Sequence, residues 1–168
     1  DSYDFTNNYD YGYDLRLRTP WKYNFSLGYT AGSSFAIGAE YEYQDYSTMR
    51  FEDTNGNKMD TETSEAKLTT KGVNTLRLGA EYKVIPEFAF RLGYNYTSAI
   101  FKNDAIKALP INSIQTDTDF TNLKAMNTYT IGVGYRGSSF YADLAYKYTV
   151  RNSDFYPFWY SEGNEVVK

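Results

Sequence analysis

Apolar and polar residues alternate along six stretches of this chain. In the first, from about residue 9 to 29, the odd positions are almost all aromatic or aliphatic, whereas the even positions are charged, polar or small. Successive side chains of a β-strand point to opposite faces. The alternation therefore predicts a long strand with one apolar face and one polar face.

Five further stretches repeat this pattern, and the six together predict an all-β protein without a separate second domain. The approximate strand bounds are 9–29, 33–50, 73–84, 88–101, 127–136 and 139–151. The apolar faces carry, one for each strand, Leu27, Ile37, Leu78, Leu92, Ile131 and Leu144. The opposite faces carry Glu40, Glu42, Arg77, Glu81, Arg91, Arg136, Asp143 and Lys147.

Short and long connections alternate between the predicted strands. Short turns at 30–32, 85–87 and 137–138 join strands one and two, three and four, and five and six, and residues 51–72 and 102–126 form the long connections. The last short turn is Gly-Ser, which favours a two-residue type II′ turn.

The predicted turns also place charged residues opposite one another on the polar faces. The first turn sets Lys22 opposite Glu40, or opposite Glu42 if the turn moves by one residue to 31–33. The second turn sets Glu81 opposite Arg91. A proline at position 20 removes a ladder donor, so the first strand is expected to kink there.

Long strands with a single apolar face suit a closed barrel in a bilayer, with lipid outside and water or a plug inside. We therefore expect an antiparallel transmembrane β-barrel in which the six Leu and Ile residues face lipid and the eight charged residues line the lumen, a possible substrate path. Outer-membrane barrels have long extracellular loops, so the long connections are expected outside a Gram-negative bacterium. The 19 tyrosines and 11 phenylalanines agree with aromatic-rich membrane interfaces.

Composition argues against several other functions. The net charge of −4 argues against nucleic-acid binding. With no histidine, the chain lacks Ser-His-Asp catalysis and histidine metal sites. We predict no enzymatic activity, no catalytic residue, no cofactor and no metal site. The loop from Asp53 to Asp60 has oxygen-bearing side chains at alternate positions, but Lys58 stands where an EF-hand needs glycine, which favours a solvated loop over a calcium site.

Short phrases follow one another along the chain. They are TPW at 19–21, LGY at 27–29, GAEY at 38–41, LGAEY at 78–82, RLGY at 91–94, GVGYR at 132–136 and ADLAY at 142–146. Their order resembles the C-terminal part of the barrel in the FadL-type outer-membrane transporters, which are channels for long-chain fatty acids and aromatic hydrocarbons. The resemblance covers residues 9–148 and implies a fourteen-stranded barrel with an N-terminal hatch. The hatch, the early strands and a terminal aromatic residue have no counterpart in this sequence.

We expect a channel for passive uptake of small hydrophobic compounds such as long-chain fatty acids or aromatics. Its expected partners are the outer-membrane bilayer, a hydrophobic substrate, and the remaining barrel strands and hatch. Six strands are too few to close a membrane barrel, so the sequence is expected to be a segment of a longer chain. The alternative is a non-transporting barrel that acts as a structural anchor or as a subunit of a surface complex. A soluble β-sandwich, the third possibility, would gather the apolar faces around a dry interior.

Overall fold

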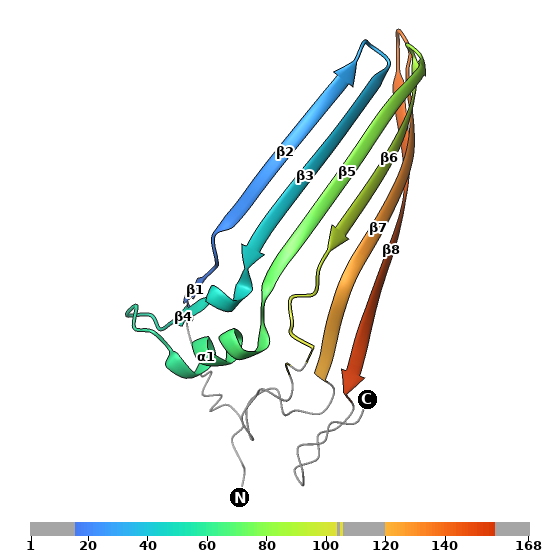
Figure 1. Ribbon diagram of the computed structural model, residues 1–168. Helices are drawn as coiled ribbons and strands as arrows, with labels where there is room; N and C mark the ends of the chain where they lie inside the picture. The colour runs from blue at the N-terminus through green and yellow to red at the C-terminus, as the bar shows by residue number, and fades with distance from the viewer. Residues whose placement is uncertain (1–15, 104, 106–119, 157–168) are drawn as a thin grey trace, which may run out of the picture.

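Six strands form one antiparallel sheet whose spatial order, β2-β3-β5-β6-β7-β8, follows the chain (Figure 1). The computed structural model describes residues 16–103, 105 and 120–156. The strand bounds are Lys22–Ala31, Phe35–Asp45, Gly72–Ile85, Phe88–Thr97, Phe120–Arg136 and Tyr141–Tyr156. The all-β prediction is confirmed. Across the described ranges the sheet is open, with β2 and β8 as its two edges.

Smaller elements gather at one end of this sheet, the long-loop end. They are the strands β1 (Arg16–Arg18) and β4 (Arg50–Glu52), which pair with each other, the 3-10 turn η1 (Tyr46–Thr48) and the helix α1 (Asp60–Thr69). Figure 1 shows them below the sheet, with the three short turns at the opposite end, the short-turn end. In the part of the chain that the structure describes, no helix has the length and apolarity needed to cross a membrane.

The first two strands differ from the prediction at the long-loop end. The expected strand 9–29 is divided into β1 and β2 by a break around Pro20, and residues 9–15 lie outside the described ranges. Proline cannot donate a ladder hydrogen bond, and the side-chain amide of Gln44 donates to the Pro20 carbonyl instead, at 3.1 Å. The expected strand 33–50 ends at Asp45, because its carboxylate accepts hydrogen bonds from the Ser47 N–H (3.1 Å) and hydroxyl (2.6 Å) and so begins η1.

The last two strands are longer than predicted. β7 begins at Phe120 instead of residue 127, and β8 continues to Tyr156 instead of residue 151. The two strands pair along this extension, with a register irregularity between Leu123 and Met126. An irregularity of this kind interrupts the alternation of faces, which explains why the pattern ended early in the sequence.

The first short turn lies one residue further along the chain than the later of its two predicted positions. Ala31 pairs with Phe35, so the turn comprises residues 32–34. Its first residue, Gly32, has a φ of 60°, a left-handed conformation that glycine adopts without strain. The turn keeps its predicted length of three residues, so the partner of each β2 residue moves by two along β3 and every side chain keeps its predicted face.

The other two short turns also differ in length from the prediction. Ile85 pairs with Phe88 beyond a bulge, which leaves two turn residues instead of three and keeps the predicted register on the sheet side of the bulge. Arg136 pairs with Tyr141, so the last turn has four residues, 137–140, and the predicted two-residue type II′ turn is wrong. The Gly137 N–H donates to the carbonyl of the last turn residue at 2.9 Å.

Candidate functional site

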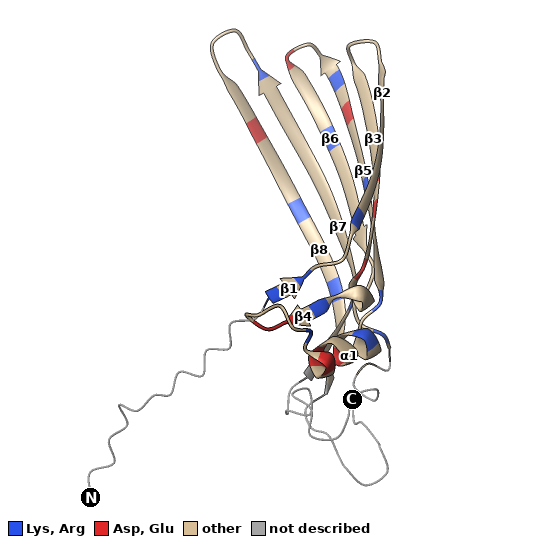
Figure 2. Cartoon of the chain, turned by 90° about the vertical axis from the view of Figure 1, so that its left-hand side faces the viewer, with Lys and Arg blue, Asp and Glu red and all other residues tan. Residues whose placement is uncertain are grey.

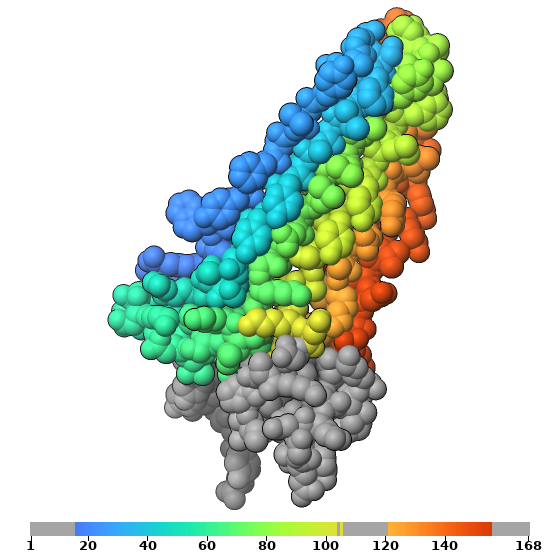
Figure 3. All heavy atoms as spheres, in the orientation of Figure 1, coloured from blue at the N-terminus to red at the C-terminus, as the bar shows by residue number. Residues whose placement is uncertain are grey.

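The six predicted lipid-facing residues all lie on one face of the six-stranded sheet. The register connects them: Ile37 pairs with Ala80, Ala80 with Leu92, and Leu92 with Ile131. Their exposed fractions run from 43% for Leu78 to 79% for Leu27. Figure 3 shows the strands as one continuous surface from β2 to β8. Among the described residues, no second sheet covers this face, so these side chains do not converge on a dry interior.

This apolar face carries no charged side chain over the central lengths of the six strands. The ranges are 23–31, 35–43, 74–84, 88–96, 127–135 and 142–150. The side-chain amides of Asn74 and Asn127 lie on this face, and the side-chain oxygen of each accepts a hydrogen bond from a neighbouring tyrosine. The Tyr41 hydroxyl donates to Asn74 Oδ1 at 2.6 Å, and the Tyr94 hydroxyl donates to Asn127 Oδ1 at 2.8 Å. Hydrogen-bonded amides are what an apolar environment requires.

The eight predicted lumen residues lie on the opposite, polar face, and the structure brings six of them into ion pairs. Near the long-loop end, Arg77 contacts Glu40 and also Glu42 at 3.2 Å. Lys22 reaches Glu42 diagonally at 3.3 Å, although its direct partner in the register is Gln44. The first predicted cross-strand pairing is therefore wrong in register, yet Lys22 and Glu42 form an ion pair.

A second cluster lies nearer the short-turn end of the polar face. Arg91 donates from Nε to Glu81 at 2.7 Å and from Nη1 to Asp143 at 2.5 Å. Glu81 and Arg91 are direct register partners, as predicted. Within the described ranges, the remaining two predicted residues, Arg136 and Lys147, have no ion-pair partner. Figure 2 shows the charged positions spread over the strands and around α1, β1 and β4.

The Arg91–Asp143 contact spans the intervening strand β7 and passes over Gly134. A Cβ atom added at Gly134 would lie 2.5 Å from Asp143 Oδ1 and 2.9 Å from Arg91 Nη1. Gly134 pairs directly with Asp143 in the register. The missing side chain at this position is therefore what allows the ion pair to form across three strands.

A row of glycines separates the two charged clusters. Gly28 pairs with Gly38, Gly38 with Gly79, and Gly79 with Gly93, so that four adjacent strands present no side chain along one line of the polar face. An open hollow of about 470 Å³ lies against part of this row. The row was not predicted from the sequence, because its recognition requires the register between strands that are joined by long connections. The signal was the glycine that directly precedes a tyrosine in LGY and RLGY and stands two residues before a glutamate in GAEY and LGAEY.

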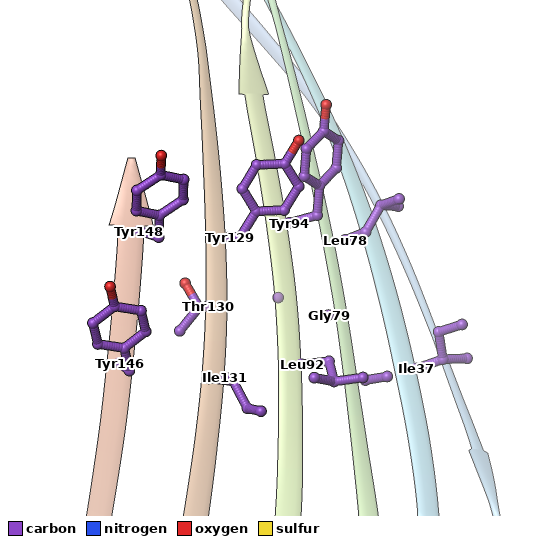
Figure 4. A pocket seen from close by; sticks show the side chains of 12 residues that line it. Ile37, Leu78, Gly79, Leu92, Tyr94, Tyr129, Thr130, Ile131, Tyr146 and Tyr148 are labelled. Atoms are coloured by element: carbon purple, nitrogen blue, oxygen red, sulfur yellow. The ribbon is translucent and has the colours of Figure 1, made fainter. Parts of the chain in front are cut away.

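The apolar face contains its own open hollow of about 480 Å³. Leucine and isoleucine side chains line one part of it, and Tyr94, Tyr129, Tyr146 and Tyr148 line the other. Figure 4 shows the hydroxyls of these four tyrosines pointing the same way, towards the long-loop end. The Tyr94 and Tyr129 rings lie 5.3 Å apart between centroids.

The loop that begins at Asp53 is held by its own hydrogen bonds. Asp53 Oδ1 accepts from the backbone N–H groups of Asn55 and Asn57, each at 2.8 Å, and Oδ2 accepts from the Asn57 side-chain amide at 2.9 Å. The Asn57 amide, followed by the backbone donors, lowers the pKa of the Asp53 carboxyl. Across the described residues, no group of three or more acidic side chains, histidines or cysteines is placed to hold a metal ion.

No protein-family model, curated protein or solved structure matches this chain. The similarity to FadL-type transporters rests on the repeated phrases alone and stays a prediction.

Proposed function

We propose that this chain forms part of the wall of an outer-membrane β-barrel through which small hydrophobic compounds, such as long-chain fatty acids or aromatics, diffuse inward. The observation that carries the proposal is the separation of charge between the two faces of a single exposed sheet. An uncharged face rich in exposed leucine and tyrosine suits contact with hydrocarbon. A face whose charges are paired with one another suits an enclosed aqueous space.

Strand length supports a membrane location. β2, β3 and β6 have 10, 11 and 10 residues, and a tilted strand needs about 9–11 residues to cross a bilayer. A barrel needs about eight strands or more, so the proposal includes further strands next to β2 and β8. Within the described ranges β2 and β8 each have only one neighbour in this sheet, and their outer edges would need such partners inside a membrane.

The polar face suits uncharged cargo better than ions. Most of its predicted charges are already neutralised by a partner, and the glycine row between the clusters exposes only backbone whose N–H and C=O groups are used in the sheet. A hydrophobic molecule that moves along the strands can therefore cross this strip without breaking a hydrogen bond or an ion pair.

Two neighbouring residues of β5 test the proposal, because their side chains lie on opposite faces. Gly79 is on the polar face, where an added Cβ meets no atom within 4 Å, and Ala80 is on the apolar face. We expect the complete protein in liposomes to take up radiolabelled fatty acid faster than empty vesicles do. Gly79→Trp should reduce this flux and Ala80→Trp should leave it unchanged. Flux reduced only by Ala80→Trp would contradict the assignment of the faces.

The second candidate is a non-transporting barrel that anchors a surface complex. It is favoured by the folded structure at the long-loop end, where α1 packs near η1 and β4, and Arg18 pairs with the buried Glu52 at 2.8 Å. Such a platform suits contact with another macromolecule. Protein that inserts into liposomes but gives no flux above empty vesicles would favour this candidate over the channel.

A further inference from the structure

Aliphatic and aromatic side chains occupy separate bands on the apolar face. The aliphatic belt is defined by Leu27, Ile37, Leu78, Leu92, Ile131 and Leu144, one for each strand. The belt does not follow the rows of paired residues. The row that starts at Leu27 passes through Ala39, Leu78, Tyr94 and Tyr129 and ends at Tyr148. Leu144 lies four residues from the end of that row, towards the short turns.

Aromatic residues flank the belt on the long-loop side of every strand except β5 and on the short-turn side of every strand except β8, and they drift in the same direction. Counted from the belt towards the long-loop end, the first aromatic residue is Phe25 on β2 and Tyr146 on β8. Tyr146 lies four residues nearer the short turns than the point where the row of paired residues from Phe25 reaches β8. On the short-turn side, the first aromatic residue is Tyr29 on β2 and Tyr135 on β7, with the same offset. The belt and the long-loop band shift by four residues over five strand spacings, and the short-turn band shifts by four residues over the four spacings from β2 to β7. All three bands therefore run obliquely across the strands in the same direction.

We infer that these bands lie parallel to a membrane plane and that the aliphatic belt contacts the hydrocarbon centre of the bilayer. This inference rests on the proposed membrane location and adds the depth of each residue and the tilt of the strands. Four residues correspond to about 13 Å along a strand, and five strand spacings correspond to about 24 Å across the sheet. The strands would thus cross the bilayer at about 30° from its normal, a little less than the tilt of about 35–45° in outer-membrane barrels.

The height and chemistry of the face fit this occupant. On β3 the apolar face runs from Phe35 to Tyr43, about 26 Å along the strand and about 23 Å along the normal at this tilt, close to the apolar band of about 25 Å in membrane barrels. The absence of charge over the central strand ranges removes the main cost of contact with hydrocarbon. The tyrosine hydroxyls in Figure 4 point away from the belt, as amphipathic rings do at a bilayer interface.

Depth measurements with single tryptophans test the tilt. The two native tryptophans are replaced by phenylalanine, and one tryptophan is introduced by Leu27→Trp, Leu144→Trp or Tyr148→Trp in protein folded into vesicles with lipids brominated at different depths. We expect deep bromines to quench the tryptophan fluorescence of Leu27→Trp and Leu144→Trp alike. The tryptophan of Tyr148→Trp should lie about 11 Å shallower than that of Leu144→Trp. Ala145→Trp, next to Leu144 but on the polar face, should resist quenching.

The possible results separate the tilt from the membrane location. Equal depths for Leu27→Trp and Tyr148→Trp, with Leu144→Trp at another depth, would overturn the tilt and leave the membrane location intact. Folded protein in which no position is quenched would overturn both. Phe25→Trp and Tyr146→Trp provide a second pair that replaces one aromatic ring with another. The inference requires these two to be quenched alike as well.

Discussion

Replacing Gly134 with alanine should break the Arg91–Asp143 ion pair while leaving the strand intact. The added Cβ would lie 2.5 Å from Asp143 Oδ1 and 2.9 Å from Arg91 Nη1, so these two side-chain ends must separate. Both are flexible, and Gly134 has no positive φ that alanine would strain. The loss is therefore confined to the contact between Arg91 and Asp143.

The magnitudes decide how this prediction must be measured. The Arg91 and Asp143 side chains are 47% and 56% exposed, so their interaction is worth about 0.2–1 kcal/mol. Replacing glycine with alanine in a strand stabilises the fold by about 0.5–1 kcal/mol through the unfolded chain. The two effects oppose each other and have similar size. The change in stability of Gly134→Ala alone should therefore be small and uninformative.

A double-mutant cycle isolates the contact. The coupling between Arg91→Gln and Asp143→Asn, measured by urea unfolding in lipid vesicles, should be about 0.2–1 kcal/mol in the parent protein and near zero in the Gly134→Ala background. Gly79→Ala is the matched control, because its Cβ would meet no atom within 4 Å and the coupling should persist. The reasoning fails if the coupling survives Gly134→Ala, or if Gly79→Ala abolishes it equally.

Two further predictions concern single hydrogen-bonded groups. Hydrogen bonds lower the folded pKa of Asp53, so the stability that they add to its loop is fully present above the unfolded pKa and should be lost as the pH falls through the folded pKa. Proteolysis at the loop should therefore increase at low pH in the parent protein. In Asp53→Asn the rate of proteolysis should lose this pH dependence. Tyr94→Phe removes the donor to Asn127 Oδ1 and should destabilise the fold by about 0.5–1.5 kcal/mol. Tyr148→Phe should change the unfolding free energy little, because this hydroxyl has no hydrogen-bond partner among the described residues.

The alternation of side chains predicted the faces of the sheet better than it predicted the strand ends. Face membership depends only on parity, and the observed turns at 32–34 and 137–140 shift the register by an even number of residues. Strand ends depend on local competitors that alternation does not report. Asp45 binds Ser47 and starts a 3-10 turn, and Pro20 interrupts the ladder. The helix α1, within a segment predicted as a long loop, was missed for the same reason.

Partners across the sheet were predictable only where a short turn fixes the register. Glu81 and Arg91 belong to one hairpin, and their pairing was correct because the bulge near the turn absorbed the difference in turn length. The contact between Arg77 and Glu40 joins β3 to β5, and that between Arg91 and Asp143 joins β6 to β8 across an intervening strand. A long connection separates the residues of each of these pairs, so no count of turn residues could have placed them together.

The oblique bands show what the complete register adds to a pattern that is visible in each strand alone. On β2, β3, β6 and β7 aliphatic residues lie between aromatic ones, but the slope of the belt exists only in the relation among strands. The aromatic bands are counted outward from the belt, so the three offsets describe one common drift. Such a common drift is expected if all six strands cross the same two interfaces at one tilt, because every strand then meets each interface further along than its neighbour. The slope therefore supports the proposed membrane location with a relation among strands that the alternation within a single strand does not contain.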